Sequence, residues 1–260
     1  MSGKNNIEIK TVAIMAAKEA GLILMSHYGN TSAKFKNEFF DIGSIVTKAD
    51  LESEDKIVSL IKENFPTHGV YAEEEHSENI EAEYVWYVDP LDGTSNFVRN
   101  IPLFGISIGV VKNGEPIYGV LYFPAINLLV EAEAGKGAFA GGKKLLVSSR
   151  KLEEALYYSG GKYKGKQQIH DGIASSVGMI KILDASSYAL AQIAMGDAEV
   201  YFLVNNPHDV VAGVCIIREA GGVISDENGG EWNLSSKKIL ATTPVLQKEI
   251  LNIIKKDVIA

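Results

Sequence analysis

The chain is organised around the stretch Tyr84-Val-Trp-Tyr-Val-Asp89-Pro-Leu-Asp92-Gly-Thr94-Ser-Asn96-Phe97. Its first five residues are aromatic or β-branched, which predicts a buried strand over 84–88. Pro90 cannot continue a strand ladder, so a turn is predicted to begin at Asp89. The segment Asp92-Gly-Thr94 is typical of a helix start, where backbone N–H groups without intrahelical partners attract anions.

Two carboxylates, Asp89 and Asp92, stand three residues apart beside this predicted helix start. They would repel a phosphate unless divalent cations lay between the acids and the phosphate. The residues therefore favour metal-assisted phosphoryl transfer as a first hypothesis. The alternative is an ordinary loop, because aspartate and glycine are common in turns that carry no chemistry.

The composition limits the functions that the 260-residue chain can have. Hydrophobic residues make up 46% of it, which is enough for one compact unit or two tightly packed halves. With 25 Lys plus Arg against 33 Asp plus Glu, the formal net charge is −8, which disfavours nonspecific binding to nucleic acid or to anionic membranes. We therefore expect a small-molecule partner, with no nucleic acid and no membrane.

The single cysteine and the first apolar run indicate a compartment. Cys215 lies in the apolar segment 214–217 and cannot form an intrachain disulfide, so a core position and a reducing, cytoplasmic location are expected. The apolar run 12–25 is interrupted by Lys18-Glu19 and is too short to span a bilayer. It predicts an amphipathic or buried helix rather than a signal sequence.

Helical and extended segments alternate before the central stretch. The predicted elements are helices over 7–27 and 51–64 and strands over 34–40 and 69–72. Asp50 stands at the start of the second helix, where it is either an N-cap or a functional acid. The run Glu73-Glu-Glu75 follows a predicted strand and, taken alone, is typical of an exposed acidic loop.

The pattern after the central stretch changes twice. Strands over 106–112, 116–123 and 127–132, with turn signals at Asn113-Gly114 and Gly141-Gly142, predict an antiparallel meander. From about Ser148 onward, strands alternate with helices. The predicted strands there are 155–158, 179–183 and 199–204, and the helices are 167–177, 186–195 and one opened by 205–209 and ending at Glu219. This change predicts two halves, 1–150 and 151–260, packed as one compact unit.

Two segments carry a resemblance to a known family. Residues 86–97 resemble the signature W-x-x-D-P-I/L-D-G-T-S/T-N-F of the inositol monophosphatase family, the magnesium-dependent, lithium-sensitive phosphatases that also include fructose bisphosphatases and bisphosphate nucleotidases. Residues 205–213, followed by Glu219-Ala-Gly-Gly222, resemble its second signature, W-D-x-A-A/G-G followed by E-A-G-G. There Asp209 corresponds to the aspartate of the signature, and His208 replaces the tryptophan. Without the resemblance, Asp209 would be interpreted as the N-cap of the helix. A metal-binding role for His208 is the less favoured alternative, because hard cations prefer oxygen ligands.

The resemblance extends from about Thr11 to Ile254 and implies a fold and a site. The fold is a mixed α/β (α+β) αβαβα sandwich of the sugar phosphatase type, with an antiparallel sheet in the first half, a mixed sheet in the second, and frequent homodimers. The implied ligands of two or three Mg²⁺ ions are Glu73, Asp89, the carbonyl of Leu91, Asp92 and Asp209. Glu74 is a further candidate beside them. The implied catalytic residues are Thr94, Asp50 and Glu73, with Asp50 polarising Thr94 to orient the attacking water. The implied substrate contacts are Gly93, Thr94, Ser95, Lys162 and Asp209.

The resemblance specifies the reaction better than the substrate. It implies metal-dependent hydrolysis of a small phosphate monoester, such as inositol 1-phosphate or a sugar phosphate. Inositol enzymes commonly have a glutamate seven residues before the second-signature aspartate, where this chain has Phe202, which weakens an inositol assignment. The lysine-rich segment 157–166 resembles the substrate region of archaeal-type enzymes that act on both fructose 1,6-bisphosphate and inositol phosphate; a solvated basic loop is the alternative.

Other functions remain open at this level. They are a fructose-1,6-bisphosphatase or dual enzyme, a 3′(2′),5′-bisphosphate nucleotidase, and a non-catalytic metal- or partner-binding protein on the same fold, because fold alone does not establish activity.

Overall fold

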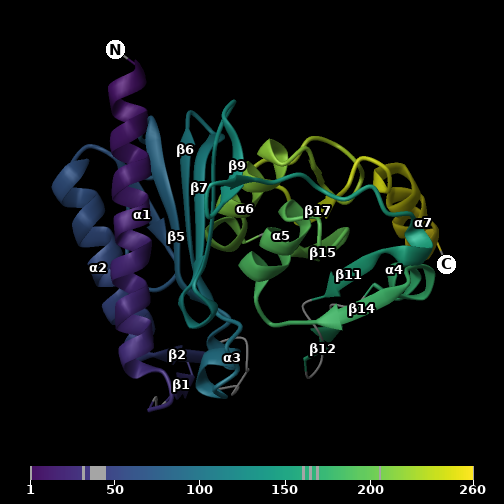
Figure 1. Ribbon diagram of the computed structural model, residues 1–260, viewed down its shortest axis with the longest axis horizontal. Helices are drawn as coiled ribbons and strands as arrows, with labels where there is room; N and C mark the ends of the chain where they lie inside the picture. Colours follow the sequence, from purple (N-terminus) through teal and green to yellow (C-terminus); the bar gives the residue numbers. More distant parts are fainter. Residues whose placement is uncertain are drawn as a thin grey trace.

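The computed structural model describes residues 2–30, 33–35, 45–159, 162–163, 166–167, 170–204 and 206–259, and the side chains of 9–30, 46–159, 170–204 and 206–256. Five layers follow one another across the molecule (Figure 1). Helices α1 (Ser2–His27) and α2 (Lys48–Asn64) cover one sheet, α5 (Ser186–Ala194) and α6 (Pro207–Glu219) lie between the two sheets, and α4 (Asp171–Ser176) and α7 (Gln247–Ile259) cover the other. The predicted layered α/β sandwich is confirmed.

The first sheet contains the predicted meander. Its described strands lie in the order β10 (Lys143–Lys144), β9 (Gly137–Ala140), β8 (Leu128–Glu133), β7 (Glu115–Phe123), β6 (Gly105–Lys112), β5 (Tyr84–Asp92), β3 (Gly69–Ala72) and β4 (Ser77–Glu78). Asn113 and Gly114 have φ of 51° and 89°, the left-handed turn that an Asn-Gly hairpin favours. Neighbouring strands are antiparallel except β3 and β5, which run parallel.

The second sheet is mixed, as expected. Its described order is β14 (Met179–Ile182), β11 (Leu156–Ser159), β15 (Val200–Val204), β17 (Lys238–Thr242) and β16 (Val223–Ser225), with β11 parallel to both neighbours and β17 antiparallel to its own. Short pairs are formed by β1 (Ala33–Phe35) with β2 (Ile45–Thr47) and by β12 (Lys162–Tyr163) with β13 (Lys166–Gln167). The remaining short helices are α3 (Thr94–Val98), η2 (Pro124–Ile126) and η3 (Leu152–Glu154).

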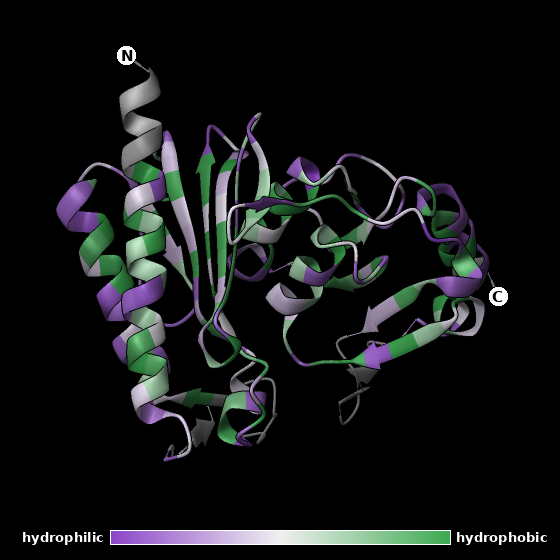
Figure 2. Cartoon of the chain, viewed as in Figure 1, coloured by the Kyte–Doolittle hydropathy of each residue, from purple (hydrophilic) through white to green (hydrophobic). Residues whose placement is uncertain are grey.

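The two predicted halves share one core. A Cβ added at Gly109 of β6 would lie 2.7 Å from the backbone nitrogen of Ala212, and one at Gly119 of β7 would lie 2.9 Å from the Ala212 Cα. Helix α6 therefore lies directly on these strands, and only glycine permits this approach. Figure 2 shows hydrophobic residues recurring along β6, β7 and α1. Cys215 is buried in α6, as predicted for a core cysteine.

Several predicted boundaries differ from the structure. The turn predicted at Asp89-Pro90 is wrong, because β5 continues to Asp92 and its register with β6 shifts between these two aspartates. Pro90 lies in this bulge, which tolerates a residue without an N–H group. Helix α2 is capped by Thr47, and α6 by Asn206, so Asp50 and Asp209 are third helical residues rather than N-caps.

The remaining differences concern lengths. Helix α1 begins at Ser2 instead of residue 7, and α4 is shorter than the predicted 167–177. Of the strand predicted over 34–40, the structure describes 33–35 as β1, and the rest lies outside the described residues. In the ranges that the structure covers, no helix combines the length and apolarity needed to cross a bilayer.

Candidate active site

Glu73 and Asp89 are brought together by two parallel strands. Ala72 of β3 lies opposite Val88 of β5, so the two strands end at the same edge of the sheet. The backbone N–H of Glu73 donates to the Val88 carbonyl at 3.1 Å. Asp89 is buried at 2% exposure, and its pKa lies well above the usual range because of burial and of repulsion by the nearby carboxylates of Glu73, Asp92 and Asp209.

The start of α6 brings Asp209 to the same place. Ser107 lies opposite Asp89 in the β5–β6 ladder, and its hydroxyl donates to the His208 carbonyl at 3.3 Å. This contact ties the first turn of α6 to the sheet edge. Asp209 is then close enough to raise the pKa of both Asp89 and Asp92.

Asp92 is held by the first residues of α5. Its carboxylate accepts the backbone N–H of Ser186 at 3.0 Å and of Ser187 at 2.7 Å, and also the Ser187 hydroxyl. Burial and repulsion by Asp209 nevertheless raise the pKa of Asp92 to about 7. The sequence offers no signal for these serines, because they carry no motif and lie 94 and 95 residues from Asp92.

Thr94 lies between β5 and α2. Gly93 precedes it with φ of +86°, and a Cβ there would lie 2.9 Å from the Leu103 carbonyl oxygen, so the position requires glycine. Thr94 Oγ1 is 3.0 Å from the Leu91 carbonyl oxygen and 3.3 Å from Asp50 Oδ1. The structure thus brings together the predicted Asp50–Thr94 pair, and the Thr94 proton has two acceptors.

Asp50 is itself fixed by a capping box at the start of α2. Its Oδ2 accepts the backbone N–H of Thr47 at 2.9 Å, and the Thr47 hydroxyl accepts the N–H of Ala49 at 3.1 Å. Burial, with a smaller contribution from Glu73, raises the pKa of Asp50 to about 6, although the hydrogen bonds from Thr47 lower it. Asp50 therefore titrates close to neutral pH.

One turn further along α2, Glu54 also faces the site. Its carboxylate accepts the backbone N–H groups of Glu74, Glu75 and His76 in the loop after Glu73. No sequence motif marks Glu54, although its i, i+4 spacing from Asp50 places both acids on one helix face. Glu74, the further metal candidate, is half-buried in this loop.

The donor chemistry suits hard divalent cations. Carboxylates that raise one another's pKa in a buried position are stabilised by protons or by bound cations, and Mg²⁺ prefers oxygen ligands. Within the described residues, no three Asp, Glu, His or Cys side chains converge closely enough to hold one ion as they stand. Asp209 Oδ1 lies 3.0 Å from His208 Nε2, and its Oδ2 accepts the Asn206 amide at 3.0 Å. The acids thus fit a cation by type, and each Asp209 oxygen keeps a further lone pair beside these contacts.

Two predicted substrate contacts, Ser95 and Lys162, stay predictions. The Ser95 hydroxyl donates to Asp184, and Ser95 is buried. Lys162 belongs to β12, and its side chain lies outside the described residues.

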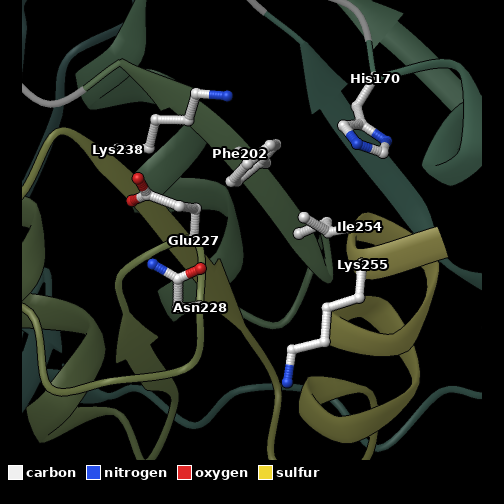
Figure 3. Close-up of a pocket in the computed structure, with 7 residues that line it drawn as sticks. All are labelled: His170, Phe202, Glu227, Asn228, Lys238, Ile254 and Lys255. Atoms are coloured by element: carbon white, nitrogen blue, oxygen red, sulfur yellow. The ribbon is translucent and has the colours of Figure 1, made fainter. Parts of the chain in front are cut away.

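Phe202 faces away from the acids. The Tyr201 hydroxyl on the same strand donates to Ser186 Oγ at 2.8 Å, next to Asp92, whereas Phe202 points to the opposite face of the sheet, because neighbouring strand residues alternate. There Phe202 lines a cavity of about 480 Å³ (Figure 3). The residues around this cavity are His170, Phe202, Glu227, Asn228, Lys238, Ile254 and Lys255. The residue seven positions before Asp209 therefore lies on the other face of the sheet from Tyr201.

A comparison with protein families decides the assignment. The model of the inositol monophosphatase family matches residues 5–258. The chain belongs to this family. This inositol monophosphatase family member is therefore a phosphoric monoester hydrolase, and its family is generally metal-dependent.

Similar proteins share nearly the whole length of this family member. The fructose-1,6-bisphosphatase/inositol-1-monophosphatase of Thermotoga maritima is 32% identical over 248 residues, covering 95% of each chain. The inositol-1-monophosphatase of Mesorhizobium japonicum is 32% identical, covering 96% of this chain and 97% of its own. The solved structure of a Thermotoga maritima IMPase superposes with a TM-score of 0.86 at 33% identity, covering 95% of this chain and 96% of that one.

Proposed function

We propose that this phosphatase uses two or three Mg²⁺ ions to hydrolyse a small sugar or polyol phosphate, with inositol 1-phosphate and fructose 1,6-bisphosphate as its test substrates. The observation that carries this proposal is the meeting of Glu73, Asp89, Asp92 and Asp209 at one sheet edge, beside the Asp50–Thr94 pair. Clustered carboxylates of this kind can bind divalent cations, and the bound cations can in turn bind a phosphate.

The chain's own residues supply the proton path. Bound Mg²⁺ would neutralise the acids and the substrate phosphate and lower the pKa of the attacking water. When Thr94 donates its proton to Asp50, the lone pairs of Thr94 Oγ1 are free to accept a proton from that water. Asp50 accepts the Thr94 hydroxyl in a hydrogen bond of 3.3 Å and so holds Thr94 Oγ1 in the orientation that this step needs. The backbone N–H groups of Gly93, Thr94 and Ser95 are proposed to orient the phosphate.

The substrate class rests on the relatives and on the position of Phe202. One relative bears the name of a dual fructose bisphosphatase and inositol monophosphatase, and another that of an inositol monophosphatase. Since Phe202 faces away from the acids, its presence is no argument against inositol phosphates. We therefore propose that both polyol and sugar phosphates are accepted.

The test is phosphate release from a substrate panel with Mg²⁺ and with EDTA. The panel contains inositol 1-phosphate, fructose 1,6-bisphosphate, adenosine 3′,5′-bisphosphate and NADP. We expect Mg²⁺-dependent release from the first two, with inhibition by Li⁺. Preference for adenosine bisphosphate would support the nucleotidase alternative instead. Release that survives EDTA would refute the metal mechanism, and no release from any ester would favour a non-catalytic binding protein.

Two further properties are proposed with the function. We expect a homodimer, which light scattering after size exclusion would detect as twice the 28.1 kDa chain mass. We also propose a cytoplasmic location, which the buried, unpaired Cys215 suits and which fractionation of the native cells would test.

A further inference from the structure

Glu54 is a buried acid whose contacts lie in a different segment of the chain. Its side chain is 1% exposed in α2, one turn after Asp50. The carboxylate accepts the backbone N–H groups of Glu74 at 2.8 Å, Glu75 at 2.7 Å and His76 at 2.9 Å, and Nδ1 of His76 lies 2.9 Å from the same carboxylate. A buried carboxylate is tolerated only when such hydrogen bonds replace its water.

These contacts are notable because the loop is already acidic. Glu73, Glu74 and Glu75 stand in succession, so a fourth carboxylate is electrostatically unfavourable there unless local dipoles offset the repulsion. The Ala72 N–H donates to the His76 carbonyl at 2.8 Å and closes the loop into a tight turn. Successive N–H groups of such a turn point inward and form a site for an anion. Glu54 supplies that anion from inside the protein.

The turn fixes one side of Glu73, and the sheet fixes the other. Glu73 directly follows β3, and its N–H donates to the carbonyl of Val88 in β5. The N–H groups of the residues after Glu73 donate to the Glu54 carboxylate. The same helix carries Asp50, which contacts Thr94. Because Asp50 and Glu54 share one face of α2, this helix sets the relative positions of Thr94 and Glu73.

We propose that Glu54 is a positioning residue that holds the turn 74–76 and thereby directs Glu73 toward Asp89. The proposal rests on the proposed function of Glu73 as a metal ligand. Replacing the charge would leave three N–H groups with a weaker acceptor, since charged hydrogen bonds are about twice as strong as neutral ones. Glu73 would then occupy several orientations, and the site would need more Mg²⁺ to form.

The first measurement uses metal-free protein and does not depend on activity. Amide hydrogen exchange at residues 74–76 is compared in wild type and in Glu54→Gln, Glu54→Asp and Asp55→Asn. Asp55→Asn is the matched control, because Asp55 lies 3.6 Å from Nε2 of His76 on the same helix and accepts none of the three N–H groups. We expect exchange to accelerate about tenfold or more in Glu54→Gln, as for the loss of one charged hydrogen bond. Glu54→Asp should accelerate less, and Asp55→Asn should match wild type.

The second measurement separates positioning from general destabilisation. We expect the Mg²⁺ concentration for half-maximal phosphate release to rise about tenfold in Glu54→Gln, while kcat at saturating Mg²⁺ changes less than threefold. Unchanged exchange at 74–76 in folded Glu54→Gln, or an unchanged Mg²⁺ requirement, overturns the proposal. If Glu54→Gln does not fold, Glu54→Asp is measured in its place. Rapid exchange of the amides of residues 74–76 in the wild-type protein would also refute the proposal. Activity without Mg²⁺ in wild type would refute the proposed function instead, while the exchange experiment still decides whether Glu54 holds the turn.

Discussion

Removing metal and raising the pH from 5 to 8 should destabilise this protein. The pKa of Asp92 is about 7 in the folded state against an ordinary value of 3.8, and that of Asp50 is about 6. The folded state therefore binds these two protons more tightly than the unfolded state, so their contribution to stability falls as the pH rises from roughly 4 to roughly 7. The pKa of Asp89 is raised in the same direction.

The size of the effect follows from the two values. At ~1.36 kcal/mol per pH unit, the interval from pH 5 to the pKa of Asp92 costs roughly 3 kcal/mol, and the interval to the pKa of Asp50 costs roughly 1 kcal/mol. The free energy of unfolding should therefore fall by ~4 kcal/mol between pH 5 and pH 8. For a chain of this size, that corresponds to roughly 10 °C in melting temperature.

The assay is urea unfolding at pH 5, 6, 7 and 8 in EDTA and again with saturating Mg²⁺. Bound cations favour the ionised acids, so the fall should shrink or disappear with Mg²⁺. Asp92→Asn is the control, because it should remove more than half of the pH dependence in EDTA. Opposing contributions from Glu52 and Glu78, whose pKa values are lowered by neighbouring lysines, are largely complete by pH 5, whereas that of His68, whose pKa is lowered chiefly by burial, reduces the fall within this interval. A stability in EDTA that is constant or rises between pH 5 and pH 7 would refute this account of the acids.

Further outcomes are expected from single substitutions. Asp92→Asn should leave less than about a tenth of wild-type phosphatase activity, which corresponds to a barrier higher by ~1.4 kcal/mol or more. Steady-state rates with Mg²⁺ measure this, and a higher retained activity would contradict the assignment of Asp92 as a metal ligand. Thr94→Ala should lower kcat more than it raises KM, with Thr94→Ser retaining more activity, and unchanged turnover at saturating Mg²⁺ would remove Thr94 from the mechanism. Gly119→Ala should lower the free energy of unfolding by roughly 1–3 kcal/mol, because its Cβ would meet the Ala212 backbone; a urea unfolding midpoint equal to that of wild type would contradict that packing.

Much of the local structure was accessible from the amino-acid sequence alone. The aromatic and β-branched run 84–88 forms a strand, Asn113-Gly114 forms the hairpin turn, and a short helix begins at Thr94. These features depend on residues that are neighbours in the chain, so short-range propensity is sufficient to predict them. The signature motifs likewise located the acids, because each occurs within a short, continuous segment.

The partners of those acids were decided only by the tertiary structure. Asp92 is held by Ser186 and Ser187, and the turn after Glu73 is bonded to Glu54; neither contact leaves a local pattern. The resemblance also compared Phe202 with a glutamate of inositol enzymes, and only the structure shows that the Phe202 side chain lies on the opposite face of the sheet from Tyr201. Hydrogen bonds to a distant carboxylate, and the face that a strand residue occupies, depend on which segments pack together, and that pairing is set by the five layers as a whole.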